Sequence, residues 1–271
     1  MNHGKWDARI RRANQLAAEF PFAAEALKFY ERLTRYQKSL YSEIEVACGT
    51  ANVRRTGGSL RTELDVFLLL PRISAFLSHV EKTAPPPLAQ ATRALQGEGS
   101  GRWQEVLRQF WESDFSRADE APSGDTLIAR LFLQPYAEYL ADHSDWILPH
   151  GTPNTCPLCG GRPLVGVLRP VGDGGKRFLS CFLCAMEWEY RRIICPSCGE
   201  EDVHKLAVYT AKEFSHVRVE ACDTCHQYIK SVDLTKDGHA VPVVDELATI
   251  PLNLWATEHG YQKLQTNMLG I

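Results

Sequence analysis

Four Cys-x-x-Cys pairs between residues 156 and 225 constrain this chain more than any other feature of its sequence. Successive pairs are separated by 21, 10 and 23 residues, and they use eight of the nine cysteines. Two consecutive units of four thiols each have the ligand number and spacing of a closed tetrahedral metal site. In chain order, the predicted ligands are Cys156, Cys159, Cys181 and Cys184 for the first site, and Cys195, Cys198, Cys222 and Cys225 for the second.

Strand-like segments between the pairs favour this sequential grouping. Residues 164–168 and 177–180 flank the glycine-rich turn 172–175, and residues 206–209 and 217–220 repeat the arrangement in the second unit. A hairpin in each unit brings its own two Cys-x-x-Cys turns together. A crossed grouping, of the first pair with the third and the second with the fourth, remains the alternative. Units this small need a bound metal for stability.

Either zinc or rubredoxin-type iron suits four thiolates, and the sequence leaves the metal open. Gly160 and Gly199 follow the first pair of each unit, where a positive φ turns backbone N–H groups toward the sulfurs. Ala185 and His226 occupy the equivalent places after the second pairs. We therefore expect those two turns to close differently, and we expect His226 to be a partly exposed residue that binds no metal.

Other uses of paired cysteines fit less well. A thioredoxin-like motif belongs after a strand, at the start of a helix, and none of the four pairs has that context.

The first residues lack the apolar core of a signal peptide, and the longest apolar run stops at Pro71. We therefore expect a cytoplasmic protein without membrane insertion. In the reducing cytoplasm, paired cysteines are more often metal ligands than disulfides.

The charge of the chain argues against nucleic acid as a partner. The formal net charge is −3, and residues 151–240 carry 11 basic and 11 acidic side chains. A zinc ribbon that binds DNA or RNA needs a basic surface, which this balance does not supply. Nucleic-acid binding therefore stands as an alternative that the composition disfavours.

The first half of the chain has helical periodicity, and the fold class predicted is α+β. Apolar residues recur at steps of three and four in several segments. We expect helices at 5–20, 22–47, from Pro71 to about 80, 86–96, 101–114 and 124–142, with 59–70 extended. The lone Cys48, at a helix end, is expected to be a buried, inert thiol.

The domain prediction follows from these patterns. It comprises an all-α domain (1–145), a linker (146–155), a first metal module (156–194), a second metal module (195–240) and a C-terminal helical segment (241–271).

Several motifs resemble the formate dehydrogenase accessory protein family, FdhE. They are Cys156-Pro-Leu-Cys159-Gly-Gly-Arg-Pro163, Leu179-Ser-Cys-Phe-Leu-Cys184 followed by Glu187-Trp188, Arg191-Arg-Ile-Ile-Cys-Pro-Ser-Cys198, Glu220-Ala-Cys-Asp-Thr-Cys225 with Tyr228-Ile-Lys230, and the closing segments 245–250 and 258–261. The resemblance implies two rubredoxin-like modules behind a helical domain, and it associates iron with them.

The same resemblance implies an assembly or maturation factor rather than an enzyme. Its partner would be the catalytic subunit of a respiratory formate dehydrogenase that contains molybdenum or tungsten, met in the cytoplasm. Trp188, Arg191, Tyr228 and Lys230 are candidates for contact with that partner. A rubredoxin-like electron-transfer protein is the alternative, and it requires iron at the thiolate sites.

Overall fold

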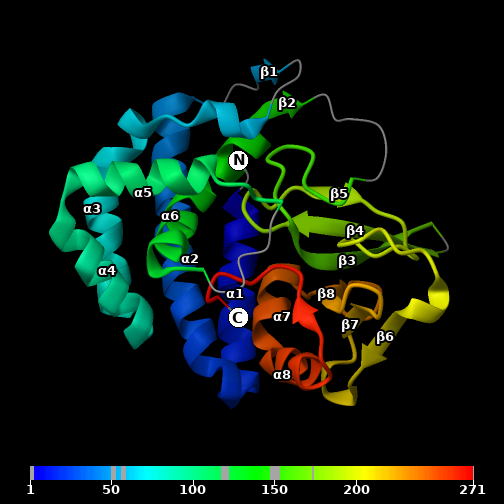
Figure 1. Cartoon of the computed structure of the whole chain (residues 1–271). Helices are drawn as coiled ribbons and strands as arrows, with labels where there is room; N and C mark the ends of the chain where they lie inside the picture. The colour runs from blue at the N-terminus through cyan, green and yellow to red at the C-terminus, as the bar shows by residue number, and fades with distance from the viewer. Residues whose placement is uncertain are drawn as a thin grey trace.

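The structure, a computed structural model, describes residues 3–49, 53–55, 59–116, 122–146, 153–172 and 174–270. Helices fill the N-terminal half, a mixed β-sheet follows, and short helices close the chain (Figure 1). The predicted α+β class is therefore confirmed. Residues 147–152 of the predicted linker, and Asp173 of the predicted turn, lie outside the described residues.

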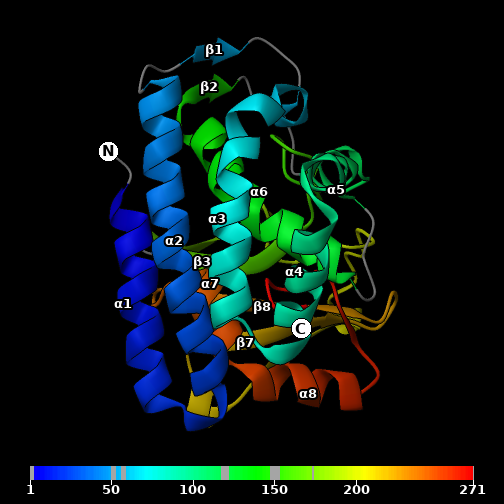
Figure 2. The same ribbon diagram turned by 90° about the vertical axis from the view of Figure 1, so that its left-hand side faces the viewer.

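Among the described residues, six α-helices make up the first half, and their apolar faces form its core. They are α1 (His3–Glu19), α2 (Ala24–Cys48), α3 (Val66–Thr83), α4 (Pro86–Glu98), α5 (Ser100–Glu112) and α6 (Gly124–Asp142), with 3-10 turns η1 (Pro21–Ala23) and η2 (Leu60–Glu63). Figure 2 shows α1, α2 and α3 running side by side. No helix in the described part of the chain is long and apolar enough to cross a bilayer.

The predicted start of α3 is wrong. The helix begins at Val66, five residues before Pro71, and the side chain of Asp65 caps it by accepting the N–H of Leu68 at 2.9 Å. Val66 and Leu69 are buried, so packing of the first turns offsets the hydrogen bond that Pro71 cannot donate. The sequence also missed a short parallel pair of strands, β1 (Val53–Arg55) with β2 (Ser144–Trp146).

Both predicted hairpins are confirmed. In the first, β3 (Pro163–Val171) pairs antiparallel with β4 (Gly174–Cys181), which also pairs with β5 (Glu187–Glu189). In the second, β6 (Leu206–Thr210) pairs antiparallel with β7 (Val217–Cys222), which also pairs with β8 (Gln227–Asp233). The 3-10 turns η3 (Val203–Lys205) and η4 (Lys212–Phe214) lie on either side of β6.

The two hairpins belong to one sheet, which the sequence did not indicate. Strands β3 and β8 pair in parallel, with Gly166 opposite Ser231, and the strand order is β5-β4-β3-β8-β7-β6. The short β9 (Gln262–Lys263) pairs with β8 away from this path. Because β3 belongs to the first hairpin and β8 pairs with β7 of the second, the two cysteine-bearing units share a continuous hydrogen-bonded framework.

Short C-terminal helices join the sheet to the helical half. The predicted final segment is two helices, α7 (Pro242–Ala248) and α8 (Ile250–Glu258). Helix α7 lies between α1 and α2 on one side and β3 and β8 on the other (Figure 1). Its Asp245 accepts from Arg12 of α1 at 3.1 Å and is 1% exposed. A single hydrophobic core therefore extends from the helices to the sheet.

Replacement of Gly166 by alanine tests the junction between the hairpins. An alanine Cβ would lie 2.0 Å from the Ser231 hydroxyl oxygen, so the Ser231 side chain or the two strands would have to shift. We expect Gly166→Ala to destabilise the protein by about 1–3 kcal/mol, measured by urea unfolding. The double variant Gly166→Ala/Ser231→Ala removes the clashing oxygen and should recover part of this loss. Equal stability of both variants would contradict the close contact.

Candidate metal centres

The first four cysteines converge beneath the helical half. Their sulfur atoms all lie within 4.8 Å of one another, and all four residues are buried. The Sγ atoms of Cys156 and Cys184 lie 3.6 Å apart, and those of Cys159 and Cys181 lie 3.3 Å apart. Sulfurs placed tetrahedrally at a Zn–S distance of about 2.3 Å stand about 3.8 Å apart, so this cluster can hold a tetrahedral ion after small adjustments.

The second four cysteines form a similar cluster that is more open. Sulfur separations are 3.8 Å for Cys195 to Cys225 and 3.7 Å for Cys198 to Cys222. Here Cys198 is exposed and Cys225 is partly exposed. Both clusters group the pairs sequentially, and the sulfurs are not brought together in the crossed arrangement. The donor sets fit two thiolate-bound metal ions, either Fe or Zn.

The residue after each of the four Cys-x-x-Cys pairs has a positive φ, which corrects the expectation that the second pairs close differently. Gly160 and Gly199 have φ of 73° and 78°, as predicted. Ala185 and His226 also adopt positive φ, of 55° and 54°, although neither is glycine. The N–H of His226 donates to the Cys222 carbonyl at 2.8 Å, as that of Gly160 does to Cys156. The geometry of the turn therefore outweighs the cost of a left-handed backbone conformation at a residue other than glycine.

Backbone N–H groups point at the sulfurs within these turns. Leu183 N–H donates to Cys181 Sγ, and Ser197 N–H donates to Cys195 Sγ, each at 3.4 Å. Without a cation, burial raises the pKa of the Cys195 thiol well above its usual value. Four buried thiols are ionised together only when a positive charge compensates them, which is what a bound metal ion supplies.

The cations beside the clusters are arginines that the sequence did not single out. The charges of Arg61 and Arg130 act on the first cluster, and that of Arg162 acts on the second. Burial lowers the pKa of Arg130 to about 10, with the charge of Cys181 opposing that shift. Arg130 lies on α6, far from any cysteine in sequence, and donates to the Phe182 carbonyl at 3.3 Å inside the Cys181–Cys184 turn.

Three of the four residues proposed as partner contacts are buried, so the prediction is wrong for them. Trp188 is 5% exposed, and its indole N–H donates to the Pro153 carbonyl at 2.9 Å. Tyr228 is 2% exposed, and its hydroxyl donates to Asn253 at 3.2 Å. Both rings therefore pack within the protein and offer no surface to a partner.

Lys230 is likewise internal, whereas Arg191 is on the surface. The Lys230 ammonium is fully buried and lies 3.0 Å from the Glu246 carboxylate of α7. Burial lowers the pKa of Lys230 to about 7, with Glu246 opposing the shift. Arg191 is exposed and forms an ion pair with Glu201 at 2.8 Å.

Two other possible sites are the lone Cys48 and the group formed by His216, Asp237 and Asp245, and neither is suited to chemistry or metal binding. Cys48 is exposed, which corrects the expectation of a buried thiol; partial desolvation raises its pKa, so it is a poor nucleophile. His216, Asp237 and Asp245 also meet, but the guanidinium of Arg12 lies between the two carboxylates, 2.8 Å from Asp237. An arginine thus occupies the position that a metal would need.

Comparisons with known proteins agree with this geometry. The family description "FdhE, central domain" matches residues 155–192, and "FdhE, C-terminal domain" matches residues 193–269. The crystal structure of the FdhE protein from Pseudomonas aeruginosa superimposes with a TM-score of 0.73 at 25% identity, covering 99% of this chain and 96% of that one. The chain belongs to the FdhE family.

Sequence relatives in the FdhE family extend over the helical half as well. The protein FdhE homolog of Aquifex aeolicus is 28% identical over 272 residues, which is 96% of this chain and 94% of that protein. The Pseudomonas aeruginosa homolog is 40% identical over 121 residues, 42% of this chain. The family matches begin at residue 155, so the cysteine-bearing part is the segment that they describe.

A glycine at position 185 should stabilise this FdhE chain. Ala185 has φ of 55°, which costs an alanine about 1 kcal/mol more than a glycine. We expect Ala185→Gly to raise the midpoint of thermal unfolding of the metal-loaded protein. Ala211→Gly is the control, because Ala211 has an ordinary φ of −118° and should lose stability. A loss of stability in both variants would contradict the argument.

Metal loss should distinguish the two clusters. Because Cys198 is exposed while the first four cysteines are all buried, a chelator should remove one metal ion quickly and the other slowly. Stopped-flow release into a chromogenic chelator would show the two phases. Cys198→Ser should abolish the fast phase, and Cys156→Ser should abolish the slow phase and lower thermal stability. A fast phase that survives in Cys198→Ser would reverse the assignment.

Proposed function

We propose that this protein is a cytoplasmic assembly factor for a respiratory formate dehydrogenase that contains molybdenum or tungsten. It would bind the catalytic subunit during maturation and catalyse no reaction itself. The observation that carries the proposal is the structural match over 99% of this chain to an FdhE protein, together with the paired cysteine motifs. The clusters have the closed four-ligand form of structural or redox metal sites, with no open position for a substrate.

The test is complex formation under reducing, metal-replete conditions. The purified protein should co-elute with the isolated catalytic subunit of a formate dehydrogenase in gel filtration. The catalytic subunit of an unrelated molybdenum enzyme serves as the control and should elute separately. Failure of the formate dehydrogenase subunit to co-elute, with both metal ions present in the accessory protein, would overturn the proposal.

Electron transfer at the second cluster is the second candidate function. The observation that favours it is the exposure of Cys198, because an electron-transfer site needs one ligand near the surface and its potential depends on that exposure. This function requires iron. Visible absorption and elemental analysis of anaerobically purified protein decide between electron transfer and a structural role for the metal ions. A thiolate–iron spectrum would support electron transfer, and two zinc ions would leave the structural role. Nucleic-acid binding gains no support, because the cysteine-rich region is electrically neutral.

A further inference from the structure

Both Cys-x-x-Cys turns of the first cluster contact the helical half of the chain. In the first turn, residues 156–159, the Leu158 carbonyl accepts the N–H of Leu60 at 2.8 Å and the hydroxyl of Ser59 at 3.1 Å. In the second turn, residues 181–184, the Phe182 carbonyl accepts from Arg130 at 3.3 Å. Each of these carbonyls lies between two predicted metal ligands, so a movement of either turn displaces a group that the helical half binds.

The helical segments that contact the two turns are also joined to each other. Arg61 follows Leu60 in η2, and its Nε donates to the Trp111 carbonyl of α5 at 2.8 Å. The Trp111 indole N–H donates back to the Arg61 carbonyl at 2.7 Å. The Arg61 guanidinium also lies over the Phe115 ring, 4.1 Å from its centroid. Phe115 in turn packs edge-on against Phe182 of the second turn, with the ring centroids 5.3 Å apart.

These contacts form a closed circuit, which we call the contact ring. It passes from the first turn to η2, then to the end of α5 and the residues that follow it, and then to the second turn; its members are Leu158, Leu60, Arg61, Trp111, Phe115 and Phe182. The circuit is completed at the first cluster, where the sulfurs of Cys159 and Cys181 are 3.3 Å apart.

A metal ion is the strongest link that this circuit can have. Strands β3 and β4 join the two turns at one end, through the pairing of Pro163 with Cys181. Four thiolates bound to one ion fix the rest of both turns. Without the ion, the buried thiols have only weak S–H hydrogen bonds to each other, and the turns can separate. Their carbonyls then leave Leu60 and Arg130.

Two arginines of the helical half favour the loaded site. The charge of Arg61 interacts with Cys159, and that of Arg130 interacts with Cys181. Four thiolates around a divalent ion leave a net negative charge, which nearby cations stabilise. Residues that shape the contact ring in the helical half therefore also act on the metal site.

We propose that the metal ion in the first site orders the contact ring, so that the occupancy of this site controls the packing of η2 and of the end of α5 in the helical half. By thermodynamic linkage, an intact contact ring must raise the affinity of the site for the ion. The attachment of α7 to α1 through Arg12 and Asp245 lies outside the ring, so the two halves stay joined when the ion leaves. The inference does not depend on which partner the protein binds.

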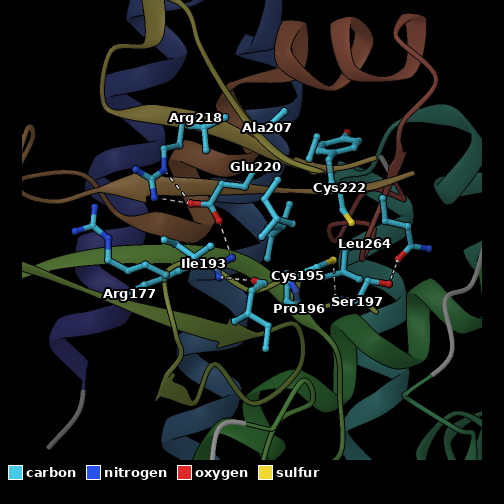
Figure 3. Close-up of a pocket in the computed structure, with 18 of the residues that line it drawn as sticks. Arg177, Ile193, Cys195, Pro196, Ser197, Ala207, Arg218, Glu220, Cys222 and Leu264 are labelled. Carbon is cyan, nitrogen blue, oxygen red and sulfur yellow. Dashed lines mark hydrogen bonds and ion pairs between the residues drawn. The ribbon is translucent and has the colours of Figure 1, made fainter. Parts of the chain in front are cut away.

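The second cluster is positioned by a different part of the molecule. In its first turn, the Ser197 hydroxyl donates to the Gln227 side chain of β8 at 2.7 Å. Cys195 and Cys222 line a hollow of about 150 Å³, and the residues that line it all lie between positions 177 and 264 (Figure 3). The second cluster therefore serves as an internal control, because its metal ion should leave the contact ring unchanged.

Hydrogen exchange of the zinc-loaded protein tests the effect of the ion on the ring. The Leu60 N–H reports directly, because it donates to the carbonyl inside the first turn. We expect its exchange to accelerate roughly tenfold or more in Cys156→Ser and to keep the wild-type rate in Cys198→Ser. The Ala84 N–H at the end of α3 is the control amide and should not change. An unchanged Leu60 rate in Cys156→Ser, or equal acceleration in both cysteine variants, would overturn the inference. Equal acceleration of Leu60 and Ala84 would do the same, because the response would then not be local.

Zinc affinity tests the reverse effect without removing a ligand of the first site. All variants are made in the Cys198→Ser background, which leaves one site of four thiolates. Arg61→Gln breaks the contact ring, and Arg32→Gln is the matched control, because Arg32 donates to the Thr83 carbonyl at 3.1 Å outside the ring. In equilibrium competition with a chelator, Arg61→Gln should weaken zinc binding roughly fivefold or more, and Arg32→Gln should bind like its parent.

Arg61→Lys separates the ring from the charge. It keeps the positive charge but loses the two-pronged contact with the Trp111 carbonyl, so it should bind zinc more weakly than the parent and more tightly than Arg61→Gln. Full affinity in Arg61→Lys together with a loss in Arg61→Gln would assign the effect to charge alone and overturn the role of the ring. Full affinity in both Arg61 variants would overturn the linkage itself, while the proposed function would stand.

Discussion

The parallel pairing of β3 with β8 is the contact on which the arrangement of this protein depends. Each strand belongs to a hairpin that ends in Cys-x-x-Cys turns, and their pairing fuses two small units into one sheet. Gly166 permits it, because any side chain there would meet Ser231. Helix α7 then covers both strands, and through Asp245 and Arg12 it ties the sheet to α1. Two units that would be marginal alone thus share one core with the helices.

This framework gives the two clusters different surroundings. The first lies under α6, where Arg130 reaches the turn between Cys181 and Cys184, and all of its cysteines are buried. The second lies near the β6 edge of the sheet, where Cys198 is exposed to solvent and Cys195 and Cys222 line a hollow of about 150 Å³. Identical ligand sets therefore differ in their exposure to solvent.

Local signals in the sequence were sufficient where the structure is local. The spacing of the cysteine pairs and the turn between residues 168 and 177 indicated the two hairpins, and both are present. The helix predicted at 124–142 is α6, and the Ser123 hydroxyl caps it by accepting the Thr126 N–H at 3.1 Å. At Pro71, by contrast, a rule about helix starts failed because buried apolar side chains upstream favoured a longer helix. The left-handed Ala185 and His226 show closure of a turn overriding residue preference.

The sequence by itself determined the eight thiols, their sequential hairpins and the helical first half, because each depends on residues close together along the chain. Only the tertiary structure decided that the hairpins form one sheet, that Arg130 lies beside the first cluster, and that Trp188, Tyr228 and Lys230 face inward. These depend on contacts between residues far apart in sequence. Such contacts form when apolar surface is buried across the whole molecule, and no local pattern encodes which faces will meet.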